Sequence, residues 1–548
     1  MTDERLSRSR RALLTALAGG TVGLAGCGSG ADSTPTDEPT PTATETPTAT
    51  ETREPQPEEN PAEIPPKDAG ISQWGRRLNE HARQAAIDWT QFEDEDITLT
   101  FGMALHPYAT TFSTTTGNGT AVKDYFEELT GISVEYEVVS EDYHWREMAH
   151  ALSSDDNPYD GIVVNTWPAG DYHFGDDGRS WVRDLQQYID DASLTDRSWL
   201  AMDDFSERTL ELLSFPGPDG SQSLVGFPNT VEVFGCTAVH EPTMETVGVE
   251  EPTTFAELES AARRIAESDD TTRAGIASRT SSAPLSAANW GTMFKTCGGE
   301  WIDRENRAAT LDSEQGVASL ERFAGMLHDY GPDDPSTYDW YAANNAYSTG
   351  DVGLCYATPQ VSGVVDESVT RETTWLPPMT GPNGRDPVVN ATVRATGITQ
   401  QSDNPEAAWL FIQWANSRQA NLLLSTRQWQ GDAPRSGFAR FDWVSEQVAA
   451  GNTPSLLGEG YIDATRQALA NVPGGDPSEP GEYPPVPLDT PQNMNVMREA
   501  AEAMSTVVAG NRTARDALDE AANEIDRAGY LTEASVPNRY VAADRFRR

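Results

Sequence analysis

The sequence predicts an α/β protein whose strands form a parallel sheet covered by helices on both faces. Three observations support this fold class. From about residue 96 the chain alternates between strand patterns and amphipathic helix patterns. The stretch YDGIVVN is a near-continuous apolar run, which is typical of a strand buried on both faces. With 548 residues, 37% of them hydrophobic, the chain is long enough for two or three domains with sizeable cores.

The first elements after residue 96 are assigned from their periodicity. Strands are predicted at 97–103, 131–139 and 159–165, and helices at 120–129 and 143–152. In such sheets ligands bind beyond the carboxyl ends of the strands. The loops ALHPY and NTWPAGDYHF, which follow the first and third strands, are therefore the first candidate binding loops.

The remaining elements follow in order. LVGFPNTVEVFGCTAVHEP is a strand-rich crossing, and the helix after it has Thr253 or Thr254 as N-cap, with Glu257 in capping-box position from Thr254. Helices and one buried strand are predicted between 284 and 357. A strand, a turn and one long helix follow at 394–428, with Trp409 and Trp414 in the core, and two more helices end the folded part.

The charge balance limits the possible partners. The chain has 86 acidic and 39 basic residues, a net charge of −47, and the acidic residues are spread along its whole length. Nucleic acid is not expected as a partner, because phosphate contacts need Lys and Arg. A cation-binding protein is one explanation. A solvated acidic surface suited to very salty water is the favoured one, and it predicts a halophilic organism.

The N-terminus carries an export pattern. Arg10 and Arg11 precede a short, glycine-containing apolar stretch at 12–25, which resembles a twin-arginine signal. The stretch ends in LAGC, which resembles a lipobox with Cys27 as the lipidated residue. Residues 1–27 are therefore expected to be a signal peptide. No run of 18 apolar residues occurs, so no spanning helix is predicted.

Residues 28–70 are rich in Thr, Pro and Glu and are predicted to be a disordered tether. Extended at about 3.1 Å per residue, some 35 residues reach on the order of 100 Å. A domain on this tether would stay near the membrane surface. Three sequons, at Asn118, Asn390 and Asn511, fit an external surface but also occur by chance.

Three cysteines follow Cys27, at 236, 297 and 355. Outside the cell an odd number allows one disulfide and one spare thiol. Three small buried hydrophobic residues are an equally good interpretation.

Four phrases in the second half carry a family resemblance. They are GFPNTVEVFGCTAVHEPTMETVGVEEPTTFAELESAARRI, YAANNAYSTGDVGLCYATPQ, TGITQQSDNPEAAWLFIQWANSRQANLLLSTRQWQGDAPRSG and VVAGNRTARDALDEAANEID. In this order the chain resembles an extracellular solute-binding protein of an ABC importer, of the carbohydrate-binding type, here as a lipoprotein from a haloarchaeon. Gly235, Cys236 and Thr237 replace a family Tyr-Asn-Lys, and Phe255 replaces a Trp. A particular sugar therefore cannot be carried over.

The resemblance implies a two-lobe periplasmic-binding-protein clamshell with discontinuous lobes and a hinge. We expect lobe one at 96–232 plus 390–430, and lobe two at 234–388 plus 436–548. A solute, most plainly a sugar or oligosaccharide, would bind between the lobes and pass to the membrane subunits of the transporter. The resemblance implies a monomer on the extracellular face of the membrane, held by the lipid at Cys27, with no cofactor, no metal and no catalytic residues.

A sugar site needs aromatic platforms for the apolar ring face and polar groups for the hydroxyls. Candidates are aromatic and polar residues in loops, at strand ends and near the expected hinge. They are His106, Asn165, Trp167, Glu232, Trp290, Trp340, Tyr341, Tyr356, Thr358, Gln360, Trp429 and Asp432. Each aromatic has packing as its alternative role, and Asp432 has that of a solvated loop carboxylate.

Two other functions remain open from the residues alone. A secreted glycoside hydrolase also combines aromatics with two carboxylates, but 86 acidic residues allow any pair to be nominated. No nucleophile elbow, HExxH, P-loop or Rossmann glycine pattern occurs. A binding protein for a non-sugar solute, including a metal or a peptide, is the other alternative.

Overall fold

The computed structural model describes most of the chain after residue 70. The described ranges are 71–113, 119–154, 156–174, 180–216, 222–303, 306–359, 367–426, 460–473 and 492–531. Contacts divide the chain into two units, Met1–Glu58 and Glu59–Arg548, and all described residues belong to the second. The predicted signal peptide, the lipidation site Cys27 and the predicted tether lie outside the described residues.

The first sheet has five strands in the order β2-β1-β3-β13-β6. Their bounds are β1 (Thr98–Ala104), β2 (Ser133–Val139), β3 (Gly161–Asn165), β6 (Phe227–Val233) and β13 (Ala391–Ile398). β1 runs parallel to β2 and β3, as predicted, but β13 is antiparallel to both β3 and β6. The prediction of a purely parallel sheet is therefore wrong. Because β13 enters from the second sheet, it starts at the edge where β1, β3 and β6 end.

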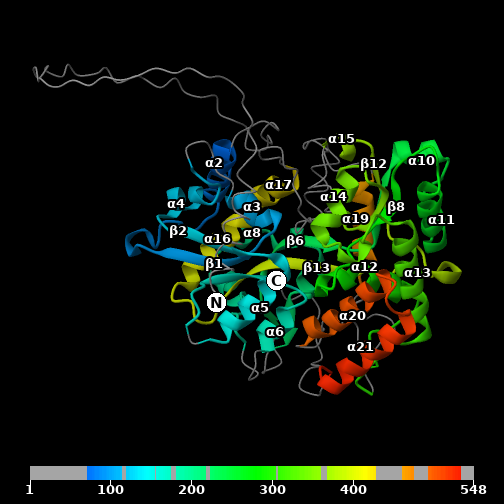
Figure 1. Cartoon of the computed structure of the whole chain (residues 1–548). Coiled ribbons are helices and arrows are strands. Elements are labelled where there is room, and N and C mark those ends of the chain that lie inside the picture. The colour runs from blue at the N-terminus through cyan, green and yellow to red at the C-terminus, as the bar shows by residue number, and fades with distance from the viewer. Residues whose placement is uncertain are drawn as a thin grey trace, which may run out of the picture. The chain divides into compact units, whose positions relative to one another are not determined.

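Helices cover both faces of this sheet (Figure 1). On one face Phe101 of β1 packs against Phe411 of α16 (Pro405–Ala415), and Phe126 of α4 (Asp124–Thr130) joins them, with ring centroids 5.0 and 5.2 Å from Phe411. Side chains alternate along a strand, so Gly102 faces the other side. There a Cβ would lie 2.5 Å from the sulfur of Met148 in α5 (Glu141–Leu152). The glycine thus lets α5 pack closely against the sheet.

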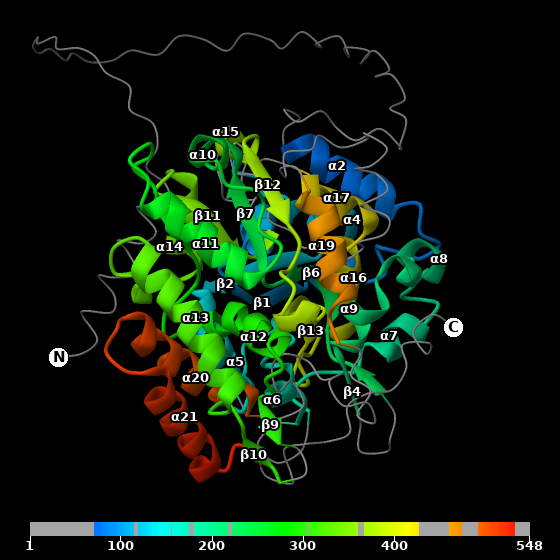
Figure 2. The same cartoon turned by 90° about the vertical axis from the view of Figure 1, so that its right-hand side faces the viewer.

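The second sheet has four strands in the order β12-β7-β11-β8. They are β7 (Cys236–His240), β8 (Ala274–Ala277), β11 (Val352–Ala357) and β12 (Thr373–Leu376). The long helices of this half are α11 (Phe255–Ala266), α12 (Ala287–Thr296), α13 (Glu314–Tyr330), α14 (Trp340–Ser348), α20 (Asn493–Val508) and α21 (Ala514–Ala528). α20 and α21 contact α13, beside which Figure 2 shows them in orange and red. The two sheets with their helices form two lobes, as predicted.

Shorter elements complete the described part. The helices are α2 (Ile71–Ala82), α3 (Pro107–Ser113), α6 (Ala169–Phe174), α7 (Gln186–Asp190), α8 (Arg197–Leu200), α9 (Glu207–Glu211), α10 (Glu241–Val247), α15 (Glu367–Thr370), α17 (Arg418–Thr426) and α19 (Tyr461–Ala470). The strands are β4 (Ser214–Pro216), β5 (Gln222–Leu224), β9 (Ile302–Asp303) and β10 (Ala308–Ala309). α2 packs on α4, so the chain before residue 96 adds to the first lobe. The proposed lobe boundaries stay a prediction.

The helix predictions are confirmed at one point and wrong at another. The Thr254 side chain accepts the N–H of Glu257, and the Glu257 carboxylate accepts the N–H of Thr254, which is the predicted capping box. The single long helix predicted within 394–428 is instead two helices, α16 and α17. The break lies at Asn416, and the side chain of Ser417 accepts the N–H of Ala420 to start α17.

The chain crosses directly from the first sheet to the second between β6 and β7. Gly235 adopts φ +87° there, and a Cβ at this position would lie 2.5 Å from Cγ2 of Thr292. Both the backbone conformation and the lack of space require glycine. The return to β13 runs through residues 377–390.

Three further predictions, on the cysteines, a membrane-spanning helix and two tryptophans, can be compared with the described residues. Cys236 and Cys355 are buried and Cys297 is half-buried, and all three are free thiols. Burial raises the pKa of the Cys355 thiol to about 12, so it remains protonated. No helix combines the length and the apolar character needed to cross a membrane. Trp409 and Trp414 are fully buried, as predicted.

Candidate functional site

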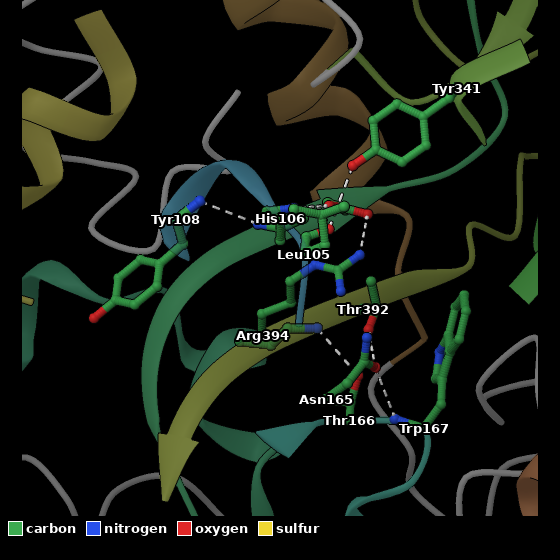
Figure 3. Close-up of polar contacts among 11 residues, drawn as sticks. Leu105, His106, Tyr108, Asn165, Thr166, Trp167, Tyr341, Thr392 and Arg394 are labelled. Atoms are coloured by element: carbon green, nitrogen blue, oxygen red, sulfur yellow. Dashed lines mark hydrogen bonds and ion pairs between the residues drawn. The ribbon is translucent and has the colours of Figure 1, made fainter. Parts of the chain in front are cut away.

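Four strands of the first sheet bring polar residues to one edge (Figure 3). β1, β3 and β6 end there near His106, at Asn165 and near Glu232, and β13 begins there with Thr392 and Arg394. The loops after β1 and β3, which the sequence predicts as binding loops, lie at this edge. The antiparallel β13 adds Arg394, which is not among the residues predicted from the sequence.

His106, Glu232 and Arg394 form a buried charged cluster. Nε2 of His106 lies 3.0 Å from Oε1 of Glu232, and Nε of Arg394 donates to the same oxygen at 3.3 Å. Nη2 of Arg394 donates to Oε2 at 3.5 Å. The backbone N–H of Tyr108 donates to Nδ1 of His106 at 3.4 Å, so the hydrogen toward Glu232 is on Nε2. Each of the three side chains is over nine-tenths buried.

The cluster holds Glu232 in its ionised form. Burial alone would raise the pKa of this carboxyl, but the Arg394 charge and the hydrogen bond from His106 outweigh it and lower the pKa to about 2. Glu232 in turn fixes the guanidinium of Arg394.

Asn165 is held in one orientation by two donors. Thr392 donates from Oγ1 to Oδ1 of Asn165 at 2.5 Å, and the backbone N–H of Trp167 donates to the same oxygen at 3.1 Å. Because both donors require an oxygen, they identify Oδ1 and leave Nδ2 as the other end of the amide. Thr166 joins the group through its hydroxyl, 3.0 Å from that of Thr392.

A pocket with about 310 Å³ of empty volume, part of it open solvent, lies at this edge. Its lining residues are Ala104, His144, Trp145, Val163, Asn165, Pro168, Leu285, Arg394 and Met494. Leu285 precedes α12 and Met494 belongs to α20, so both lobes contribute to its walls. The pocket is thus a small opening between residues of the two lobes.

His144 and Trp145 were missed from the sequence. Both lie near the start of α5, which begins at the carboxyl end of β2. Nε2 of His144 donates to the carbonyl of Gly102 at 3.2 Å, which ties the helix to β1. The rule that selected the loops after β1 and β3 applies equally to β2 and would have found these residues.

The other aromatic candidates near this edge have different roles. Trp167 is buried with its ring 5.3 Å from that of Phe234, and it donates from Nε1 to the carbonyl of Ala391. It packs at the crossing and does not line the pocket. Tyr341 of α14 is 39% exposed, and its hydroxyl donates to the carbonyl of Leu105 at 3.4 Å, which links the second lobe to the loop after β1. Trp340 packs edge-on against Tyr341.

The remaining candidates are not brought to the pocket by the described structure. Trp290 is fully buried and stacks on Phe294 at 5.3 Å in the core of the second lobe. Tyr356 is also fully buried, with its ring beside those of Phe255 and Phe323. Thr358, two residues further along the chain, is buried as well. The last three candidates, Gln360, Trp429 and Asp432, lie outside the described residues.

The described residues hold no group of three or more His, Cys, Asp or Glu side chains that could bind a metal ion. The carboxylate–imidazole–guanidinium cluster is instead satisfied internally.

Comparison with known proteins identifies relatives of this chain. Residues 113–422, more than half of the chain, match the model of the bacterial extracellular solute-binding protein family. A curated relative, the erythritol/L-threitol-binding protein of Mycolicibacterium smegmatis, is 24% identical over 429 residues, which are 71% of this chain and 84% of the relative.

Solved structures show the same fold. An ABC transporter solute-binding protein of Agrobacterium radiobacter in complex with ribitol has a TM-score of 0.63 at 19% identity and covers 79% of this chain and 98% of its own. Maltose-bound MalE3 of T. maritima has a TM-score of 0.60 at 16% identity, with 79% and 100% covered. These similarities confirm the predicted two-lobe periplasmic-binding-protein fold. The chain therefore belongs to the bacterial extracellular solute-binding protein family, whose members bind substrates rather than transform them.

Proposed function

We propose that this protein captures a small polyhydroxylated solute, such as an alditol or a monosaccharide, and delivers it to an ABC importer. The observation that carries the proposal is the pocket at the strand ends, which both lobes line. The enclosed part of this pocket is small, about 20 Å³, so a solute larger than a water molecule requires the two lobes to move apart before it binds.

The relatives support the same class of ligand. The curated relative is named for erythritol and L-threitol, and two of the similar structures hold ribitol and D-mannitol. The link between Tyr341 and Leu105 supports a closure step, because it joins α14 to the loop after β1. A ligand that contacts both lobes binds the closed state more tightly than the open state, and it therefore raises the population of the closed state.

Binding is tested by thermal unfolding of the purified full-length protein in concentrated KCl. The panel contains alditols of four to six carbons, monosaccharides, maltose, amino acids and short peptides. A ligand at 100 times its dissociation constant adds about 2.7 kcal/mol to the free energy of unfolding. We expect alditols or monosaccharides to raise the midpoint. A rise with amino acids or peptides alone refutes the proposal.

We further propose that the protein is a lipoprotein on the extracellular face of the membrane of a halophile. The twin-arginine pattern at Arg10 and Arg11, the LAGC sequence and the net charge of −47 support this localisation. Cys27→Ala should release the protein into the medium, whereas Cys297→Ala, a control that removes a different thiol, should leave it on the membrane. Retention of Cys27→Ala on membranes contradicts the anchor.

A glycoside hydrolase is the less favoured alternative. A general acid for glycosidic cleavage needs a raised pKa. Glu232, the carboxylate of the cluster described above, has a lowered pKa and both oxygens bound. Incubation with oligosaccharides should release no product.

A further inference from the structure

Two side chains of the second lobe form hydrogen bonds with backbone carbonyls of the first lobe. The hydroxyl of Tyr341 in α14 donates to the carbonyl of Leu105 at 3.4 Å (Figure 3). Nδ2 of Asn493, the first residue of α20, donates to the carbonyl of Trp167 at 3.1 Å. The two acceptors lie in the loops after β1 and β3.

Both contacts border the pocket between the lobes. Three of the four contact residues are chain neighbours of residues that line it. The pairs are Leu105 with Ala104, Trp167 with Pro168, and Asn493 with Met494. Tyr341 and Asn493 are not themselves among the lining residues. The lobes can therefore separate around the pocket only if at least one of these hydrogen bonds breaks.

The two contacts lie at different distances from the place where the chain crosses between the lobes. The strand order is β2-β1-β3-β13-β6, and the crossings are at the end of β6 and the start of β13. Trp167 follows β3, the neighbour of β13, and it packs against Phe234 and donates to Ala391, which both lie at the crossings. Leu105 follows β1, one strand further away. The Asn493 contact is thus on the hinge side of the pocket, and the Tyr341 contact is on the far side.

Burial also distinguishes the two contacts. Asn493 is 0% exposed, and the other contact of its Nδ2 among the described residues is the sulfur of Met497 at 3.8 Å, a weak acceptor. Loss of the Trp167 carbonyl would leave this buried donor poorly satisfied, which is costly. Tyr341 is 39% exposed, so water can replace each partner when its hydroxyl and the Leu105 carbonyl separate. The Tyr341 contact is therefore the easier one to break.

We propose that the lobes part at the Tyr341 contact while the Asn493 contact is kept, so that the solute enters between α14 and the loop after β1. The inference rests on the proposed function and specifies how its site is reached. The enclosed volume of about 20 Å³ requires such an opening. Tyr341 is then a positioning residue: its hydroxyl bonds Leu105 in the closed state alone and favours that state without touching the solute.

Removal of the Tyr341 hydroxyl tests the contact that breaks. Erythritol, ribitol and D-mannitol are titrated into the full-length protein and its variants by isothermal calorimetry in concentrated KCl. Tyr341→Phe should weaken every solute that binds by the same factor, roughly three- to fivefold, because a hydrogen bond is lost from the closed state alone. The guanidinium chloride unfolding midpoint of the solute-free variant should equal that of the wild type.

Asn493→Ala tests the contact that is kept and should give the opposite result. A hydrogen bond present in both the open and the closed state cancels from the affinity, so binding should stay unchanged. The unfolding midpoint of the solute-free protein should fall, because the buried Trp167 carbonyl loses its donor. Tyr330→Phe is the matched control: it removes a hydroxyl at the end of α13 in the same lobe and should change neither quantity.

The outcomes separate this inference from the proposed function. A loss of affinity with Asn493→Ala, or none with Tyr341→Phe, overturns the inference and leaves the proposed function standing. A loss with Tyr341→Phe that differs from one solute to the next indicates direct contact with the solute and overturns it as well. If no alditol or monosaccharide binds the wild type, the proposed function fails, and the inference fails with it.

Discussion

Replacement of Glu232 by Gln should lower the free energy of unfolding by about 3 kcal/mol at pH 7, because breaking a buried ion pair strands the remaining charge. Arg394 and Glu232 are 5% and 4% exposed, so water cannot replace the lost partner. In the native protein both His106 and Arg394 donate to the carboxylate of Glu232. The NH2 group of a Gln at this position would face one of these two donors, and that hydrogen bond would be lost.

The lowered pKa of Glu232 is consistent with a stabilised carboxylate and predicts how the effect depends on pH. The folded protein lowers this pKa from 4.5 to about 2. A shift of between two and three units corresponds to about 3 kcal/mol of differential stabilisation of the charged form. Since the folded value lies below the unfolded one, the contribution is complete above about pH 4.5 and declines as the pH falls toward 2. Roughly half of it should remain at pH 3.

The assay is guanidinium chloride unfolding of wild type and Glu232→Gln at matched pH values between 7 and 3. The difference between the two proteins should shrink by about half across this range. Asp190→Asn is the matched control, because Asp190 pairs with Arg197 at the surface and should cost under about 1 kcal/mol. A difference below about 1 kcal/mol at pH 7, or one that does not change with pH, refutes the account of the cluster.

Three further substitutions test the fold. Gly235→Ala should destabilise by about 1–3 kcal/mol in denaturant unfolding, because φ is +87° and the new Cβ would lie 2.5 Å from Cγ2 of Thr292; a neutral result contradicts the strain. Trp414→Ala should lower the free energy of unfolding by about 3–5 kcal/mol, since the side chain is fully buried and donates to Asn79. A variant as stable as the wild type would contradict this packing. Thr254→Ala should cost about 1 kcal/mol, measured as a lower unfolding midpoint, whereas Thr254→Ser should retain the cap and the stability.

The elements that the sequence predicts well are those whose signal is local. The capping box at Thr254 depends on residues three apart, and the burial of Trp409 and Trp414 follows from an apolar segment that is hydrophobic all round. The direction of β13 is not local. Its direction depends on the sheet from which the chain arrives through the 14 residues 377–390. No periodicity in the sequence indicates which sheet that is.

The residues of the candidate site also include some that a local sequence signal predicts and some that depend on tertiary packing. Strand ends mark His106, Asn165 and Glu232 because ligands gather beyond the carboxyl ends of strands. Trp290 and Trp145 show the limit: each stands near a helix start, but one packs against Phe294 and the other lines the pocket. The strand-end rule, applied to the strand at 131–139, would have favoured Trp145, whereas the burial of Trp290 against Phe294 depends on tertiary packing that the sequence does not show.

The position of Gly235 has a consequence for retargeting this receptor to another ligand. Glu232 lies three residues before this glycine, and Thr392 and Arg394 follow closely on the return crossing. A substitution on β6 or β13 near these positions is therefore expected to affect both the polar cluster and the packing where the chain crosses between the lobes. α5 connects β2 and β3 within one lobe, away from both crossings, and its residues His144 and Trp145 line the pocket. Directed evolution of selectivity should begin on that helix.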